Sequence, residues 1–213
     1  MSPAGVIALI VALLVAVLVL RLLFVFVVGR AVGRQALAQQ PDRIGLVETN
    51  PQAWKDPAAA DRLTEPLLLL GYEKAGMFTV AEMPGVVLRL LVHMRESVLA
   101  MVYEHPVAGQ WVELVTRYAD GTTCAVTSCA DHGLAPRPGH PVTFLPGTDP
   151  AGLHARLLAS RPQGAMLPIE SAQAAQAFAD GFAEAMAWRK AQGVSRGEVL
   201  KVAVRWSVKR RAA

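Results

Sequence analysis

Residues 4–28 form an almost unbroken apolar run, AGVIALIVALLVAVLVL, then Arg21, then LLFVFVV. The run contains no acid, amide or proline, and it is longer than the roughly 20 apolar residues with which a helix crosses a bilayer. At about 1.5 Å per residue it extends about 38 Å, against a hydrocarbon core of about 30 Å. The run therefore predicts a transmembrane helix, and the rest of the chain would fold beside a membrane.

A cleavable signal peptide and a buried core helix are the alternatives for this run. Ala36-Leu37-Ala38 resembles a signal-peptidase site, but residues 1–3 carry no positive charge and the run exceeds the ~7–15 residues of a signal core. Arg30 and Arg34 also separate the run from that site. A core helix is disfavoured because the run is hydrophobic on every side. We expect an uncleaved signal-anchor, with cleavage of a minor fraction after Ala38 left open.

The positive charges around the run predict its orientation. Arg21, Arg30 and Arg34 all lie on its C-terminal side, so the positive-inside rule puts the N-terminus outside and the C-terminal domain in the cytoplasm. Arg21 lies near the cytoplasmic end, where its long stem can carry the guanidinium to the interface, which we favour over a functional charge within the membrane. All three arginines are expected at the membrane interface. The Ala, Val, Leu and Arg bias gives the impression of a bacterial protein, and the expected location is the inner (plasma) membrane.

The remaining chain is expected to divide into a linker and one domain. Residues 1–40 form the anchor and its helical extension, which Pro41 ends. Residues 41–60 contain three prolines and read as a linker, in which Trp54 either lies at the membrane interface or packs on the domain. Residues 61–213 form a cytoplasmic α+β domain, large enough for its own core, with a basic C-terminal helix.

Apolar residues with a period of two predict an antiparallel meander of about five strands. From Phe78 the chain takes the strand period, and residues 86–94 and 98–105 read as a strand pair broken at 95–97. One face of the first strand is apolar, whereas the other, with Arg89 and His93, is half polar. Residues 141–145 are expected to add a last short strand.

Asp120-Gly121 predicts a hairpin between residues 110–118 and 122–128, since this dipeptide favours a type I′ turn. A two-residue loop would pair Tyr118 with Thr123. One face would then hold the following residues: Val112, Leu114, Thr116, Tyr118, Ala125 and Thr127.

Helices are expected before and after the sheet. Residues 61–72 start a helix near Pro66, and Thr148-Asp149-Pro150 caps a helix that continues to Ser160. Residues 171–192 form a longer helix that covers one sheet face. Its apolar stripe comprises Ala175, Phe178, Phe182 and Met186. Ser195-x-x-Glu198 is a capping-box pattern that begins the last helix.

No motif indicates a family, a catalytic group, a cofactor or a metal. Cys124, Cys129, His132 and His140 match no common zinc spacing, and two cysteines five residues apart on one strand point to opposite faces, which also disfavours a disulfide. A Cys129–His132 pair lacks any further support for a nucleophile. Asp180 and Glu184 read as a solvated helix face.

The basic C-terminal segment is the one feature with a positive functional interpretation. Residues 185–213 hold eight Lys or Arg and one acid, Glu198. The plainest interpretation is a solvated helix face with a charged terminus. Among functional uses the segment best fits an anionic membrane surface, ahead of an acidic partner protein or nucleic acid, since the interleaved aromatic residues of single-strand binders are missing. The predicted contact residues are Lys201, Arg205, Trp206, Lys209, Arg210 and Arg211.

Three functions fit this organisation. The first is a non-catalytic accessory or scaffold subunit of an inner-membrane assembly, whose partners are the bilayer and other membrane proteins. The second is a lipid- or small-ligand-binding module with an apolar cavity lined by Leu88, Leu90, Met101 and Phe182. The third is an enzyme in which His93, His105 or His132 meets a carboxylate or thiol in a cleft. The first is the main expectation.

Overall fold

The computed structural model describes residues 3–195 and 197–198, without the side chains of residues 3–12, 18, 22, 25 and 26. The chain divides into two compact units. The first comprises the described parts of residues 1–40, 132–135 and 190–213, and the second comprises residues 41–131 and 136–189. Each unit is described by itself.

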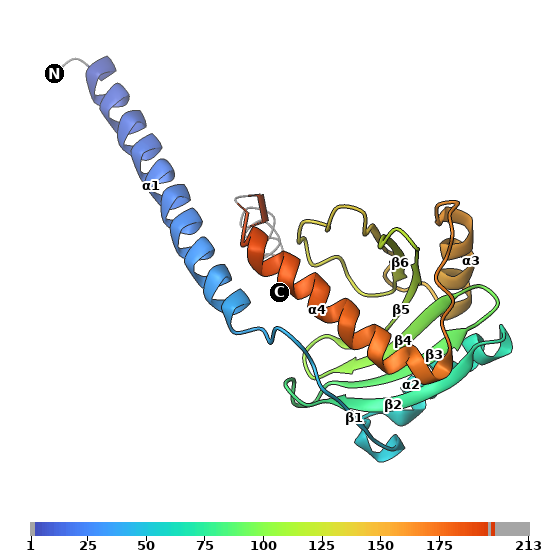
Figure 1. Cartoon of the computed structure of the whole chain (residues 1–213). Helices are drawn as coiled ribbons and strands as arrows, with labels where there is room; N and C mark the ends of the chain where they lie inside the picture. The colour runs from blue at the N-terminus through green and yellow to red at the C-terminus, as the bar shows by residue number, and fades with distance from the viewer. Residues whose placement is uncertain (1–2, 196, 199–213) are drawn as a thin grey trace. The chain divides into compact units, whose positions relative to one another are not determined.

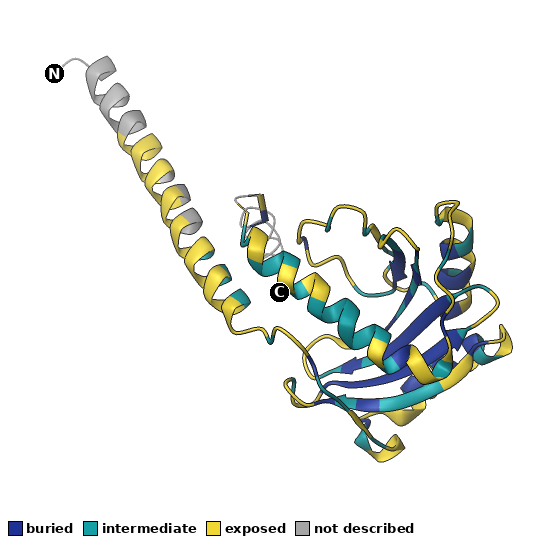
Figure 2. Cartoon of the chain, in the orientation of Figure 1, coloured by how far each residue is buried: buried dark blue, intermediate teal, exposed yellow. Residues whose placement is uncertain are grey.

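A single helix, α1 (Pro3–Ala38), covers the predicted anchor and its extension. Its described apolar side chains are largely exposed, as the yellow helix of Figure 2 shows: Leu13, Leu14, Val15, Val17, Leu20, Leu23, Phe24 and Val27. Within the described residues, no helix reaches the length and hydropathy required of a membrane span. The end of α1 lies against residues 190–194, because Lys190 Nζ donates to the Gln40 carbonyl (2.7 Å) and Val194 packs close to Gly33.

The second unit is built on a seven-stranded sheet, which confirms the α+β class. Figure 1 shows the sheet, whose strands follow chain order. All neighbouring strands are antiparallel except the last pair, β6 and β7, which is parallel. They are β1 (Leu46–Glu48), β2 (Glu73–Val80), β3 (Val87–His93), β4 (Val98–His105), β5 (Gly109–Arg117), β6 (Thr123–Thr127) and β7 (Val142–Phe144). The predicted antiparallel meander of about five strands was too small and ended differently. It lacked β1, which is only three residues long and lies in the proline-rich stretch read as a linker, and β2, which begins at Glu73; the last pair of the observed sheet is parallel.

The hairpin between β5 and β6 has a different register from the predicted one. Tyr118 pairs with Thr122, and the Gly121 N–H donates to the Tyr118 carbonyl (3.0 Å), so the loop has three residues. Gly121 has φ +83°, as the left-handed last position of such a loop requires. Since a shift by one residue exchanges the faces of a strand, Cys124 and Val126 replace Ala125 and Thr127 beside Leu114.

The helix predicted to begin near Pro66 begins earlier. α2 (Pro57–Leu69) is capped by Asp56, whose side chain accepts from the Ala59 N–H (2.9 Å), and Pro57 occupies the first turn. Pro66 lies inside the helix. Buried residues on α2 hold it against the sheet despite this proline: Ala60, Thr64 and Leu67.

Helices cover both faces of the sheet, and Figure 2 shows the buried residues concentrated on its strands. α2 and α3 (Pro150–Ser160) contribute to the core on one face, which includes Leu91, Leu114 and Leu153. The short helices η1 (Pro51–Ala53) and η2 (Ser171–Gln173) precede α2 and α4. α4 (Ala174–Gln192) covers the other face, with Phe178 and Phe182 packed on the core there, as predicted. This double cover explains why β3 is buried on both faces.

The capping box predicted at Ser195 is present. The Ser195 N–H donates to Glu198 Oε2 (2.8 Å), and the Glu198 N–H donates to Ser195 Oγ (3.2 Å). Residues 199–213, which include the predicted membrane-contact residues, lie outside the described chain. The two reciprocal hydrogen bonds between Ser195 and Glu198 thus confirm the predicted capping box.

Candidate functional site: a buried arginine beside an open groove

The predicted interface arginines all lie on α1. Arg21, Arg30 and Arg34 are exposed. The six predicted contact residues of the C-terminal helix fall outside the described residues: Lys201, Arg205, Trp206, Lys209, Arg210 and Arg211. The membrane-interface role of the three arginines and the contact role of the six C-terminal residues therefore both stay predictions.

The cysteines and nearby histidines are scattered. Cys124 is buried in β6, Cys129 follows that strand, and both are free thiols. His140 Nδ1 lies 3.0 Å from Thr123 Oγ1, and burial together with the Arg137 charge lowers its pKa. Across the described residues, no three His, Cys, Asp or Glu side chains are grouped as a metal site would require.

His93 and His105 make hydrogen bonds to the main chain. The Glu96 N–H donates to His93 Nδ1 (3.2 Å), so its Nε2 carries the proton and donates to the Leu70 carbonyl (3.1 Å). His105 Nδ1 accepts from the N–H groups of Val107 and Ala108 at the β4–β5 turn (3.1 Å each). Both side chains therefore stabilise turns.

His93, which is half-buried, also belongs to a ring cluster with the buried Tyr72 and His154. The Tyr72 hydroxyl lies 2.9 Å from His154 Nδ1, and the two imidazoles stack at 5.7 Å. Burial, and then the neighbouring His93, lower the pKa of His154, while burial raises the pKa of Tyr72. This cluster joins the start of β2, the end of β3 and α3, and it suits a structural role.

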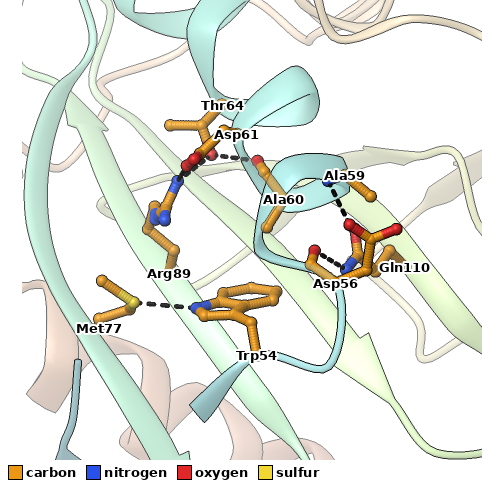
Figure 3. A network of polar contacts seen from close by, with 9 residues as sticks. All are labelled: Trp54, Asp56, Ala59, Ala60, Asp61, Thr64, Met77, Arg89 and Gln110. Atoms are coloured by element: carbon orange, nitrogen blue, oxygen red, sulfur yellow. Dashed lines mark hydrogen bonds and ion pairs between the residues drawn. The ribbon is translucent and has the colours of Figure 1, made fainter. Parts of the chain in front are cut away.

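Arg89 is the least expected side chain of the structure. It lies in the middle of β3, facing α2, and only 4% of the residue is exposed. Its Nη1 donates to Asp61 Oδ1 (2.8 Å) and to Thr64 Oγ1 (2.7 Å), as Figure 3 shows. Nε is buried and has no hydrogen-bond partner in the described chain. A buried guanidinium remains charged, so this incomplete pairing is costly.

Trp54 lies beside the same guanidinium. Arg89 Cζ is 5.6 Å from the centroid of the indole, within the range of a cation–π interaction. The indole N–H points to Met77 Sδ (2.9 Å), and Figure 3 shows the ring between β2 and the start of α2. Trp54 is buried, which decides between the two predicted alternatives in favour of packing on the domain.

The segment after Trp54 is fixed to the sheet by Glu104 of β4. Its carboxylate accepts from the N–H groups of Lys55 (2.6 Å) and Asp56 (3.2 Å) and from Gln110 Nε2 (2.6 Å). Burial would raise the pKa of Glu104, but these hydrogen bonds outweigh it and lower the pKa. Glu104 thus positions the cap of α2 and, with it, Trp54 and Asp61.

An open groove of about 540 Å³ lies at this place, on the edge of the sheet where β1 ends. β1 and the segment after it supply Glu48, Thr49 and Pro51, β2 supplies Lys74, Gly76 and Met77, and Asp61 and Arg89 complete the lining. The two cations of this lining, Lys74 and Arg89, lie on β2 and β3, and its two acids, Glu48 and Asp61, lie on β1 and α2. The groove combines a buried cation with a mixed-charge rim.

A second groove of about 570 Å³ lies along α4, lined partly by Arg117, Asp180 and Glu184. Glu184 is 3.7 Å from both Arg117 Nη2 and Arg137 Nη1, so it contributes ion pairs rather than a merely solvated face. These partly exposed pairs link α4 to β5 and to the loop before β7, and each contributes little to stability.

Sequence reasoning missed the role of Arg89 although its signal was visible. A single arginine in the run VLRLLV marks a strand position where an apolar face is interrupted. The prediction went no further than calling this face half polar, and it did not place a helix over Arg89. The apolar residues proposed to line a cavity instead belong to a packed core: Leu88, Leu90, Met101 and Phe182.

A scan against protein-family models and searches of the curated proteins and of the solved structures found no match to this chain.

Proposed function

We propose that this chain is a membrane-anchored, non-catalytic interaction module, an accessory subunit of a membrane assembly. The observation that carries the proposal is the exposure of the apolar side chains of α1. Contiguous exposed apolar surface of this kind marks contact with lipid or with another protein. The sequence of residues 4–28 supports lipid as the main contact, because the run is apolar on every side.

The second unit supports a binding rather than a catalytic role. Its two cores are packed with side chains of its own helices and strands, and the hydrogen bonds described above for His93 and His105 stabilise turns. A tether also raises the effective concentration of the domain near other membrane proteins, so weak contacts suffice for assembly. The orientation proposed is N-terminus outside and domain in the cytoplasm, from the positions of Arg21, Arg30 and Arg34.

Membrane extraction tests the anchor. The native chain should stay in the membrane pellet after an alkaline carbonate wash and enter solution with detergent. Val17→Glu combined with Leu20→Glu should abolish this behaviour, since buried acids are costly in lipid. Gln35→Glu combined with Gln39→Glu, placed beyond the apolar run, is the matched control. Release of the native chain by carbonate would contradict an integral anchor.

A protease assay tests the orientation. A C-terminal tag should resist protease added to intact spheroplasts and should be digested in inverted membrane vesicles. The reverse pattern would place the domain outside the cell and overturn the proposed orientation.

Purification in mild detergent, followed by mass spectrometry, tests the accessory role. Recovery of the same membrane proteins in fixed stoichiometry would support it and would name the process by association. Recovery of the chain alone would count against it.

The basic C-terminal segment is proposed to contact anionic headgroups, at about 1 kcal/mol per Lys or Arg near the surface. Replacing Lys201, Arg205, Lys209, Arg210 and Arg211 by Gln should leave the anchor in place. It should increase protease cleavage of the tail in vesicles containing phosphatidylglycerol, with no change in phosphatidylcholine. If the tail of the native chain is cleaved equally in vesicles of both lipids, the proposed contact with anionic headgroups is wrong.

A further inference from the structure

The guanidinium of Arg89 has one edge that the protein does not use. In the described chain both of its side-chain hydrogen bonds are made by Nη1, to Asp61 and Thr64, and the buried Nε has no partner. The edge formed by Nε and Nη2 presents two parallel N–H donors. This is the geometry that donates to both oxygens of a carboxylate at once. The donors have the orientation that a bidentate anion requires, but Nε has almost no accessible surface in this conformation, so a neighbouring side chain of the groove lining must shift to admit the ligand.

The surroundings hold this edge in place. Nη1 is fixed by two short hydrogen bonds, and the indole of Trp54 covers a face of the guanidinium at 5.6 Å. Thr64 is itself fixed, because its hydroxyl donates to the Ala60 carbonyl (2.7 Å). An arginine with few accessible conformations loses little entropy when a ligand binds.

The compensation of the Arg89 charge is incomplete. Asp61 is the acid paired with Arg89, and its side chain is 56% exposed, whereas the side chain of Arg89 is 5% exposed. Solvent therefore weakens the attraction between the two charges, while the guanidinium has lost most of its own hydration. An additional anion at the free edge would offset this cost.

The groove next to Arg89 limits the charge of such an anion. Its lining contains Arg89 and Lys74 but also Asp61 and Glu48, so its formal charges balance. A ligand with a multiply charged phosphate would be repelled by both acids, whereas a single carboxylate adds only one charge. The volume of about 540 Å³ leaves room for a small organic group attached to that carboxylate.

We propose that the groove between β1, β2 and α2 binds a small organic carboxylate, held by the Nε–Nη2 edge of Arg89 and assisted by Lys74. This ligand site does not depend on the membrane anchor or on a protein partner. The carboxylate would displace solvent from the groove and complete the pairing of the buried guanidinium.

The indole N–H of Trp54 is the reporter for this site, because the ring lies on Arg89 and its N–H is bonded to Met77 of the groove lining. The full chain, labelled with ¹⁵N-tryptophan and held in detergent, is titrated with sodium acetate that replaces sodium chloride at constant ionic strength. The Trp54 signal, assigned with Trp54→Phe, should shift and saturate. The Trp111 signal should not, since that ring stacks on Tyr103 at 4.6 Å, away from the groove.

Two exposed rim residues supply variants that leave the core intact. Lys74→Gln should weaken acetate binding and Glu48→Gln should strengthen it, each by about twofold to fivefold as expected for exposed charges. Arg89→Lys keeps the charge but lacks the fork and, if it folds, should abolish the saturable shift. The opposite signs of the two rim variants are the decisive expectation.

Three results would overturn the proposal. One is a Trp54 signal that does not saturate with acetate. Another is an equal shift with sodium sulfate, which would show a general anion effect and not a carboxylate site. The third is a change of affinity in the same direction for Lys74→Gln and Glu48→Gln.

Discussion

The Glu104 carboxylate accepts a hydrogen bond from the backbone N–H of Lys55 at 2.6 Å, although 49 residues separate them in the chain. Glu104 lies on β4, and Lys55 precedes the cap of α2. This contact and the one to Asp56 fix the start of α2 over the sheet. Asp61, Thr64 and Trp54 all depend on that placement.

Removing the charge of Glu104 should therefore destabilise the fold. We expect Glu104→Gln to lower the free energy of unfolding by about 1–2 kcal/mol, as for other buried charge-assisted hydrogen bonds. The pKa of Glu104 is lowered in the fold, so its contribution is complete above its unfolded pKa and is lost as pH falls through the folded value. Denaturant unfolding at pH 3 to 7 checks both. Glu65→Gln, on the exposed face of α2, is the control.

Glu113 should have the opposite pH dependence. Burial raises its pKa to about 7 from 4.5, so the protonated form is favoured in the folded state. Its effect is to make stability fall as pH rises from about 4.5 to about 7, because the unfolded chain there binds fewer protons. Glu113→Gln should flatten this part of the unfolding curve. An unchanged slope would mean that Glu113 is ionised in the folded protein.

Substitutions of Thr64 and of Asp61 should lower the free energy of unfolding by different amounts, although both residues accept a hydrogen bond from Arg89 Nη1. Thr64 is buried, so Thr64→Val leaves a buried donor without its acceptor, and we expect a loss of about 1–3 kcal/mol. Asp61 is half exposed, and Asp61→Asn removes the charge but keeps a side-chain oxygen that can accept from Nη1, so a smaller loss is expected. Thermal unfolding of the two variants gives the order, and a larger loss for Asp61→Asn would contradict this account.

Two leucines of α2 provide a matched test of its packing. Leu67 is fully buried between the helix and the sheet, whereas Leu69 is 89% exposed. Leu67→Ala should cost about 2–5 kcal/mol, the usual range for a buried leucine, and Leu69→Ala should have almost no effect. Chemical denaturation of both variants measures the difference. Similar losses would show that α2 is packed by a different face.

Local signals in the sequence predicted the elements of this fold better than their pairing. The Asp149 cap, the end of α3 at Ser160 and the capping box at Ser195 depend on contacts within a few residues and were confirmed. The Asp120-Gly121 hairpin was located but shifted by one residue. The same dipeptide fits a two-residue and a three-residue loop, and the choice depends on which face of β6 the core buries.

Contacts between residues far apart in the chain could not be predicted from the local hydrophobic pattern. β1 is too short to show a period, and its pairing with β2 depends on residues more than 25 positions away. The burial of Arg89 depends on α2 crossing β3, and α2 was expected to start about nine residues later, near Pro66 rather than Pro57. The sequence therefore indicated both sheet and helices but not the groove between them.

The two edges of the sheet, β1 and β7, are each only three residues long. A bare backbone edge is a template on which another chain can extend a sheet, and shortening it removes most of that template. The short edge strands therefore leave little backbone free for strand exchange or aggregation, and any recognition at these edges would depend on side chains.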